Sequence, residues 1–452
     1  MSVYLSTEAY NELPVIIIGA GPIGLAAAAH LAFRYEPFIL FDQADTVGSS
    51  QCAWGHVKLF TPWQYNIDPV ARKLLEITKW APPSDDDYPT GSELRDRYLV
   101  PLANLPEIQP NIRLVHRVTG IARQSIGITE DRRSTAPFEV VCDVNGESQR
   151  FYGRAVIDAS GTWGHPNSIL ANGLPLRDTA ELATCIEYGI PDVLGVQHAT
   201  YAGKRTLVVG SGHSAMNVVR DLVALAEAEP DTQVYWAIRR DEQSDACGDD
   251  SFLNERTLLR RDTRELVRSG KVQLLTGVRI TDVALTDEGL RIESATGELP
   301  VVDRIVACTG FQPDLTIERE LRTEIFSIFE CVYNIAELID PDRNACGTVP
   351  PHGVDRLRQP EPDFFILGSK SYGRCGTFLL YTGYEQVRSV VAELCDDESA
   401  NEIVLQLPER GLCSACDAWL EEHGSGCACG ESGEDCCDEA VDAREDAEVA
   451  HA

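Results

Sequence analysis

The clearest pattern of apolar and polar residues lies near the start of the chain. Four β-branched apolar residues, Val15–Ile18, are followed by a glycine-rich turn and by an alanine-rich stretch that continues to Phe33. Within this run His30 is the one polar side chain, so its length alone would allow a membrane span. The β-branched block and the glycine turn instead predict a buried strand, a tight turn and a helix.

The turn carries a complete GxGxxG motif, spelled Gly19-Ala20-Gly21-Pro22-Ile23-Gly24. In such a turn the first glycine allows the bend, the second lets a pyrophosphate approach the backbone, and the third lets helix and strand pack closely. The helix N-terminus then offers unpaired N–H groups to the phosphates. The next apolar strand, Phe38–Phe41, ends in Asp42, whose carboxylate suits ribose hydroxyls and repels a 2′-phosphate. These residues predict a dinucleotide site.

The same succession of strand, turn and helix recurs in mid-chain. The strand-like residues 206–209 (TLVV) precede the sequence Gly210-Ser211-Gly212-His213-Ser214-Ala215, in which Ala215 replaces the third glycine and is still small. We expect His213, at the helix start, to pack near cofactor phosphates. The next strand, 234–238, ends in Arg239 and Arg240. Guanidinium groups at this point suit a 2′-phosphate and predict NADP(H), while the acids at 241 and 242 keep NADH open.

Two further strands run into turns of small residues, at 156–162 and 305–311. They mark the points where the chain crosses between two domains. The predicted fold is α/β, with two Rossmann-like dinucleotide-binding domains and the second inserted into the first. We expect the first domain in 1–165 and 306–400, the inserted domain in 166–305, and a tail in 401–452.

Composition narrows the classes of function. The chain has 452 residues, of which 44% are apolar, and 39 Lys and Arg against 71 Asp and Glu give a formal net charge of −32. The apolar content is sufficient for hydrophobic cores. The negative charge repels nucleic acid and anionic membranes, so we expect no binding to either. Residues 1–14 lack the basic start of a secretory signal, and the 15 cysteines do not resemble a secreted disulfide scaffold. We predict a cytoplasmic protein with mostly reduced thiols.

The motifs resemble those of the two-dinucleotide-binding-domain flavoproteins, and among them the flavin-containing monooxygenases and their bacterial relatives. The resemblance covers about residues 14–395 and is carried by GAGPIG at 19–24, SGTWGHP at 160–166, GKRTLVVGSGHSA at 203–215 and CTGFQPD at 308–314. It implies that the first turn binds FAD and the second binds NADPH. It also implies that Gly161, Thr309 and Gly310 line the domain junction.

The resemblance assigns further residues to the flavin. Trp54, Thr61 and Trp63, in WGHVKLFTPW, are expected near the isoalloxazine, although the aromatic residues of this stretch fit a core equally well. Val118 is expected to meet the adenine end of FAD. The SYGR sequence that follows Gly368 resembles a bacterial subgroup associated with arsenic or metal resistance.

The chain also departs from these families. The monooxygenase signature ahead of the second turn is not present in standard form, and only His198 suggests it. Cys52 has no second cysteine at CxxC or CxxxxC spacing, and neither spacing occurs in the inserted domain, which argues against thioredoxin-reductase chemistry in its usual form. The usual closing GD motif is altered, because Gly368 runs into Ser369 and Lys370 rather than Asp.

The resemblance implies a mechanism in which NADPH reduces FAD and the reduced flavin adds O₂. The resulting C4a-hydroperoxyflavin passes oxygen to a small soft nucleophile with a sulfur, nitrogen or arsenic centre. The protein then has to position the flavin, hold NADP⁺ and exclude water. No catalytic side chain is assigned beyond the flavin-proximal candidates.

The tail differs in composition from the rest of the chain. It holds six of the fifteen cysteines, namely Cys413, Cys416, Cys427, Cys429, Cys436 and Cys437. Its acidic, glycine-rich sequence has no apolar period and predicts a flexible extension. The CxxC, CxC and CC spacings put thiolates within reach of one soft ion such as Zn²⁺, Cu⁺ or As(III). Metal(loid) capture, a dithiol that takes electrons from the flavin, and an inert redox-labile tail remain open.

Three classes of function follow. The first is an NADPH- and FAD-dependent monooxygenase that acts on a small molecule with O₂. The second is an NADPH-dependent flavin reductase of a disulfide or metal(loid), which uses the tail cysteine pairs as a shuttle. The third is a non-enzymatic metal(loid)-binding or redox-sensing protein.

Overall fold

The first glycine turn belongs to a parallel sheet. The computed structural model describes residues 10, 12–176, 180–240, 254–340, 349–376 and 378–405. A five-stranded sheet has the order β18-β7-β1-β2-β3, and each neighbouring pair is parallel. Its strands are β1 (Val15–Ile18), β2 (Phe38–Phe41), β3 (Ile112–Arg113), β7 (Ala155–Asp158) and β18 (Phe364–Ile366). The predicted strands at 15–18 and 38–41 are confirmed.

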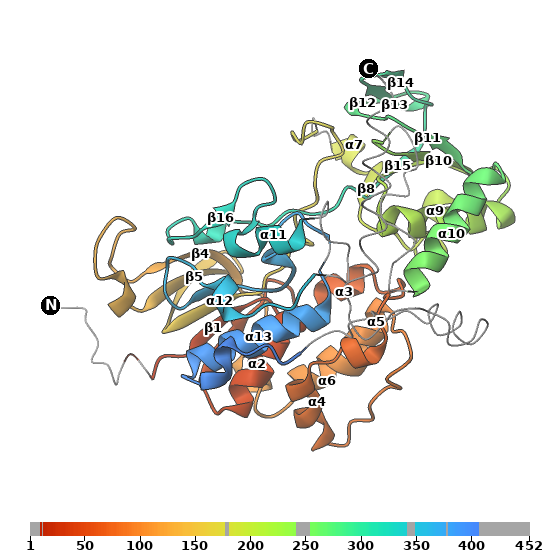
Figure 1. The fold of residues 1–452 in the computed structure, drawn as a ribbon. Coiled ribbons are helices and arrows are strands. Elements are labelled where there is room, and N and C mark those ends of the chain that lie inside the picture. The colour runs from red at the N-terminus through yellow and green to blue at the C-terminus, as the bar shows by residue number, and fades with distance from the viewer. Residues whose placement is uncertain are drawn as a thin grey trace, which may run out of the picture. The chain divides into compact units, whose positions relative to one another are not determined.

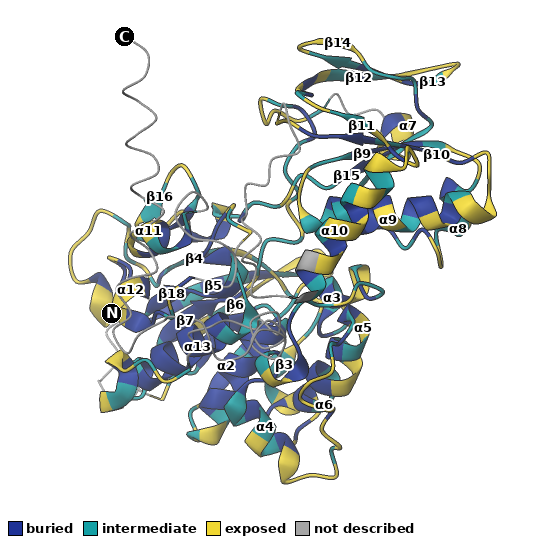
Figure 2. Ribbon diagram, turned by 45° about the vertical axis from the view of Figure 1, so that its right-hand side comes forward, coloured by how far each residue is buried: buried dark blue, intermediate teal, exposed yellow. Residues whose placement is uncertain are grey.

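Two helices and a three-stranded sheet enclose this parallel sheet. The helices α2 (Pro22–Phe33) and α13 (Leu380–Leu394) pack against each other, and both are dark with buried residues in Figure 2. A helix that is apolar all round, as the alanine-rich α2 is, belongs inside a protein. The antiparallel strands β4 (Arg117–Arg123), β5 (Phe138–Val144) and β6 (Glu147–Gly153) form the three-stranded sheet, and β6 contacts β1.

The second glycine turn belongs to another parallel sheet. Its order is β11-β10-β9-β15-β8, with each neighbouring pair again parallel. The strands are β8 (Ile186–Tyr188), β9 (Arg205–Val209), β10 (Gln233–Ala237), β11 (Gln273–Leu275) and β15 (Arg304–Ala307). Because side chains alternate along a strand, Val208 packs with α9 (His213–Ala228) while Leu207 packs with the hairpin of β12 (Ile280–Thr286) and β13 (Gly289–Ser294). Helix α10 (Asn254–Arg268) lies beside α9 (Figure 1).

The remaining helices and strands are short. The helices are α3 (Ser49–Ala53), α4 (Pro69–Glu76), α5 (Gly91–Leu94), α6 (Val100–Ala103), α7 (Ala180–Ala183), α8 (His198–Tyr201), α11 (Ala336–Ile339) and α12 (Val354–Leu357). The strands are β14 (Gly297–Glu298), β16 (Ile325–Phe326) and β17 (Cys331–Val332). In the described part of the chain no helix is long and apolar enough to cross a membrane.

The predicted α/β fold with two parallel sheets is confirmed. The strands of the second sheet lie between β7 and β18 of the first in sequence, so the second domain is inserted into the first, as predicted. Two details of the predicted domain limits need adjustment. The limit between 305 and 306 falls inside β15, which pairs along its length with β9. Residues 401–405, placed in the tail, are held by α13, since the Leu405 N–H donates to Glu385 Oε2 at 2.7 Å.

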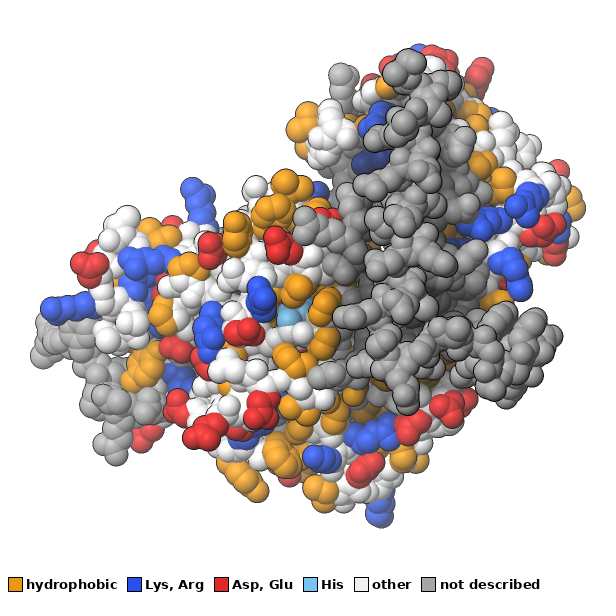
Figure 3. Space-filling model, viewed as in Figure 1, with side chains coloured by type: hydrophobic (Ala, Val, Ile, Leu, Met, Phe, Trp, Pro, Cys, Tyr) orange, Lys and Arg blue, Asp and Glu red, His pale blue; other side chains and the backbone are white. Residues whose placement is uncertain are grey.

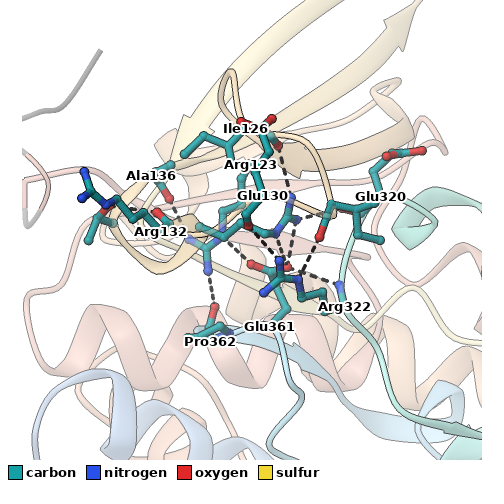
Figure 4. Close-up of polar contacts among 12 residues, drawn as sticks. Arg123, Ile126, Glu130, Arg132, Ala136, Glu320, Arg322, Glu361 and Pro362 are labelled. Atoms are coloured by element: carbon teal, nitrogen blue, oxygen red, sulfur yellow. Dashed lines mark hydrogen bonds and ion pairs between the residues drawn. The ribbon is translucent and has the colours of Figure 1, made fainter. Parts of the chain in front are cut away.

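A buried ionic network joins the two distant parts of the first domain (Figure 4). Glu361, just before β18, accepts from Arg123 Nε at 2.7 Å and from Arg133 Nη2 at 2.9 Å. The Arg322 backbone N–H donates to the same carboxylate at 3.2 Å. The three charged side chains of this cluster are at most 3% exposed. The two arginines therefore share one carboxylate, which balances one of their two positive charges at a place that water cannot reach.

The described surface carries charges of both signs. On the face drawn in Figure 3, acidic and basic side chains are interspersed. The expected lack of a nucleic-acid partner stays a prediction.

Candidate functional site

The first glycine turn has the geometry that its sequence predicts. Gly19 has a φ of +102°, and a Cβ there would lie 2.5 Å from the Ala159 carbonyl oxygen. A Cβ on Gly24 would lie 1.8 Å from the Gly19 carbonyl oxygen. Gly21, in contrast, has no atom within 4 Å of such a Cβ. The turn is therefore closed on the inside and open at Gly21, where a phosphate can approach the start of α2.

The second turn repeats this arrangement. Gly210 has a φ of +129°, and a Cβ there would lie 2.3 Å from the Cys308 carbonyl oxygen. Gly212 has no atom within 4 Å of a built Cβ, and Ala215 is fully buried beneath the turn. The N-terminus of α9 is thus accessible through Gly212 in the way that α2 is through Gly21.

One cavity of about 900 Å³ joins the two turns. Of the predicted binding residues, it is lined by Gly19, Gly21, Pro22, Ile23, Asp42, Trp54, Gly161, Gly210, Gly212, His213, Ser214, Arg239, Arg240, Thr309 and Gly310. Gly24 and Ala215 are buried behind it. A smaller cavity of about 120 Å³ is lined by Val118, together with Asp42 and Gly161. Asp42 and Gly161 line both cavities.

Asp42 is fixed by backbone donors. Its Oδ2 accepts from the Ala20 N–H at 2.6 Å, and its Oδ1 accepts from the Ala44 N–H at 2.8 Å. Burial raises the pKa of this carboxyl, and the two N–H groups partly offset the rise. Each oxygen keeps a second lone pair, so the carboxylate can still accept from a ribose hydroxyl.

The charged side chains on the wall of the large cavity are mostly basic. Among the described residues they are Arg239, Arg240, Arg256 and Arg374, with Asp42 the one acid. In a chain with a net charge of −32, this local excess of guanidinium groups favours an anionic ligand. Arg256, on α10, is 7% exposed and was missed in the sequence because no motif spacing marks it.

His213 is held as a neutral ring. Arg256 Nη2 lies 3.4 Å from His213 Nδ1, and the Phe60 ring meets the imidazole edge-on at 5.2 Å between centroids. Burial, with Arg256 and Arg260 adding to it, lowers the pKa of His213 to about 3. Because Nδ1 accepts from an arginine, the proton of the neutral ring lies on Nε2. Nε2 is buried and has no hydrogen-bond partner among the described residues.

The neutral state of His213 predicts a pH dependence of stability. In the unfolded chain His213 binds a proton near pH 6.5, whereas in the folded chain it binds one only near pH 3. The unfolding free energy therefore falls as the pH falls from 6.5 to 3. Between pH 7.5 and 5.5 we expect wild type to lose about 1 kcal/mol more unfolding free energy than H213Q. Urea unfolding at both pH values measures this. H165Q, which removes a 51% exposed ring, should behave as wild type, and equal losses in all three chains would contradict the prediction.

Two flavin-proximal candidates lie elsewhere. Thr61 and Trp63 are 7% and 1% exposed and do not line the cavity. Thr61 Oγ1 donates to Asn66 Oδ1 at 2.9 Å, while Asn66 Nδ2 donates to the Thr61 carbonyl at 2.7 Å, so this turn folds the pair into the core. The aromatic residues of this stretch that reach the wall are Trp54 and Phe60.

The cavity also holds two thiols. Cys308 Sγ donates to the Gly189 carbonyl at 3.2 Å, and burial raises its pKa to about 12. Burial, with help from Asp340, raises the pKa of Cys375 to about 11. Both are therefore neutral, weakly nucleophilic thiols at physiological pH. The described cysteines form no disulfide, and the described residues contain no cluster suited to a metal ion. The six tail cysteines lie outside the described residues.

The strand ends at the domain crossing are tied together beside the cavity. The Asn167 N–H donates to the Gly310 carbonyl at 2.9 Å, and Thr309 Oγ1 donates to the Asn167 carbonyl at 2.6 Å. Trp163 and Phe311, one from each crossing, stack at 4.6 Å between ring centroids and line the wall. Thr309 and Gly310 thus lie where the two crossings meet, together with the aromatic residues Trp163 and Phe311, to which the sequence assigned no role.

Comparison with known proteins agrees with this geometry. Residues 16–330 match the family model described as pyridine nucleotide-disulphide oxidoreductase. A protein of Arabidopsis thaliana described as a probable indole-3-pyruvate monooxygenase (YUCCA9) is 27% identical over 210 residues, which are 46% of this chain and 44% of that protein. The chain thus spans under half the length of this curated relative.

Solved structures share the fold. Bacillithiol disulfide reductase from Bacillus cereus has a TM-score of 0.61 at 16% identity, over 85% of this chain and 99% of that one. The cadaverine monooxygenase of desferrioxamine biosynthesis from Erwinia amylovora has a TM-score of 0.60 at 14% identity, over 88% and 97%. Together with the family match, these similarities confirm the resemblance to the monooxygenase-like flavoproteins with two dinucleotide-binding domains.

Proposed function

Because the chain belongs to the pyridine nucleotide-disulphide oxidoreductase family, we propose that it is an FAD- and NADPH-dependent oxidoreductase that uses O₂ to oxygenate a small soft nucleophile. The observation that carries this proposal is the cavity of about 900 Å³ that both glycine turns line. Two dinucleotides bound at these turns would share one cavity. When bound, the nicotinamide supplies a hydride and the flavin supplies the chemistry toward O₂.

The residues present fit both groups. At the first turn, Gly21 leaves room for a pyrophosphate, and Asp42 offers lone pairs to a ribose. At the second turn, Gly212 is equally open and the Nε2–H of His213 has no described acceptor. Arg239 and Arg240 supply positive charge on the same wall. We assign FAD to the first turn and NADPH to the second.

The state of the thiols supports an oxygenase over a disulfide reductase. Cys308 and Cys375 are neutral thiols on the cavity wall, and neither forms a disulfide with another described cysteine. A dithiol relay needs a thiolate that attacks and a partner that resolves the mixed disulfide. We propose that the tail cysteines form a soft metal(loid) site. If they instead pass electrons from the flavin to a disulfide, the chain is a reductase, and this is the alternative to be tested.

Isotope labelling separates the two reactions. The full chain is incubated with NADPH and ¹⁸O₂ and with thioanisole, trimethylamine or monomethylarsonous acid, and the products are analysed by mass spectrometry. We expect ¹⁸O in one product, with NADPH consumed in proportion. A variant with the six tail cysteines changed to serine should give the same yield. If wild type instead reduces a disulfide with NADPH and this variant does not, the chain is a reductase.

Cofactor choice gives a further prediction. Arg239 is exposed on the cavity wall, where a guanidinium can pair with a 2′-phosphate. R239A should raise KM for NADPH by about 10- to 100-fold and leave KM for NADH within about twofold. Steady-state kinetics with both coenzymes measure this. R261A, which removes a 72% exposed arginine on α10 that does not line the cavity, is the matched control. Equal losses for both coenzymes in R239A would show that Arg239 does not read the 2′-phosphate.

A further inference from the structure

Three ionisable side chains meet in the core behind the first nucleotide site. Lys370 Nζ donates to Asp158 Oδ2 at 2.6 Å and lies 3.8 Å from Glu318 Oε2. These side chains are at most 2% exposed. Asp158 Oδ1 also accepts from Ser160 Oγ at 2.6 Å and from the Ser160 N–H at 3.0 Å. Glu318 differs from its partners, because neither of its carboxylate oxygens has a hydrogen bond among the described residues.

The cluster backs directly onto both cavities. Asp158 ends β7 and is followed by Ser160 and Gly161, which line the two cavities. Lys370 follows Gly368 and Ser369, which line the larger one. Asp314 and Ile317, which are close to Glu318 in sequence, line the smaller cavity. Ser369 thus stands where the closing acid was expected, and the next residue, Lys370, is a buried cation behind the wall of the first site.

The charge of the cluster depends on one proton. Burial raises the pKa of Glu318 to about 8, with Asp158 and Asp314 adding to the rise and Lys370 opposing it. Burial lowers the pKa of Lys370, but Asp158 and Glu318 outweigh burial and hold it above its usual value. Strand β4, which packs on the Glu318 turn, carries Arg117 and Arg123, whose partners are Asp143 and Glu361. Loss of the Glu318 proton therefore makes the charge of the cluster more negative by one.

We propose that Lys370, Asp158 and Glu318 set how tightly the first nucleotide site holds an anionic dinucleotide, with a strong hold while Glu318 is protonated and a weaker one after it ionises. A buried negative charge behind the wall acts on phosphates through protein rather than water, so it is poorly screened. By linkage, a bound dinucleotide must also favour the protonated form of Glu318 and take up a proton. The inference rests on the proposed binding of FAD at the first turn.

FAD affinity at two pH values tests this inference. The full chain, freed of nucleotide, is titrated with FAD at pH 6.5 and pH 9.0, and binding is followed by fluorescence. In wild type we expect Kd to be about tenfold higher at pH 9.0. In E318Q, which keeps the shape and removes the ionisation, the two Kd values should agree within about twofold. E293Q, which changes a 45% exposed side chain, should behave as wild type.

Calorimetry adds a second readout. At pH 8, in two buffers of different ionisation enthalpy, FAD binding should take up protons in wild type and clearly fewer in E318Q. An equal pH dependence in wild type and E318Q, or none in wild type, would overturn the inference and leave the proposed function standing. If FAD bound at neither pH, the proposed function itself would fail, and the inference with it.

Discussion

G24A should prevent the first domain from folding stably. The added Cβ would lie 1.8 Å from the Gly19 carbonyl oxygen and 3.4 Å from Ile17 Cγ2. Both neighbours belong to the strand and turn that define the site, so neither can move without opening the contact between β1 and α2. We expect a loss of more than about 3 kcal/mol of unfolding free energy. Urea unfolding, followed by tryptophan fluorescence, measures the loss.

G21A is the matched control in the same turn. A Cβ at Gly21 meets no atom within 4 Å, and the residue has an extended backbone, with a φ of −83° and a ψ of −173°. Its unfolding free energy should stay within about 1 kcal/mol of wild type. Its affinity for FAD should nevertheless fall by about tenfold or more, because the methyl occupies the approach of the pyrophosphate. Similar stability for G24A and G21A would show that the turn is not packed as described.

E361Q should strongly destabilise the chain, although Glu361 lines neither cavity. It removes the negative charge that Arg123 and Arg133 share in the core, where their side chains are 0% and 3% exposed. Loss of one partner of a buried pair costs about 3 to 5 kcal/mol, because a buried charge is left unpaired. We expect a loss of this size in the unfolding free energy at pH 7.5.

The exposed pair of Arg291 and Glu293 provides the comparison. Their side chains are 49% and 45% exposed and lie 3.3 Å apart, so E293Q should change stability by less than about 0.5 kcal/mol. The two arginines also hold the pKa of Glu361 below its usual value in spite of burial, so the contribution of this network is present above pH 4.5 and is lost below it. A loss under about 1 kcal/mol in E361Q would mean that the network adds little.

Local patterns were sufficient to predict the two glycine turns. Strand, glycine turn and helix are continuous in sequence, so Gly19, Asp42, Gly210 and Arg239 were located by spacing alone. Both turns line one cavity in the structure, as the α/β fold required. A residue of the cavity wall could be predicted wherever a motif fixes both the residue type and its distance in sequence from a strand end.

Other site residues depend on contacts between distant segments. Phe60 lines the cavity and Thr61 does not, because Asn66 turns the chain inward, and no apolar period reveals that turn. Arg256 reaches His213 from another helix, 43 residues further along the chain. Lys370 and Asp158 are 212 residues apart and meet only because β7 and β18 are neighbours in the sheet. Such pairings follow from topology, which a single sequence does not specify residue by residue.

In the proposed function, the cavity that both glycine turns line lets NADPH and FAD meet. Anaerobic stopped-flow mixing of the FAD-bound chain with NADPH tests it most directly, through the flavin absorbance near 450 nm. We expect complete bleaching by one equivalent of NADPH, slower bleaching by NADH, and return of the colour when O₂ is admitted. FAD that stays oxidised in excess NADPH and NADH would contradict it.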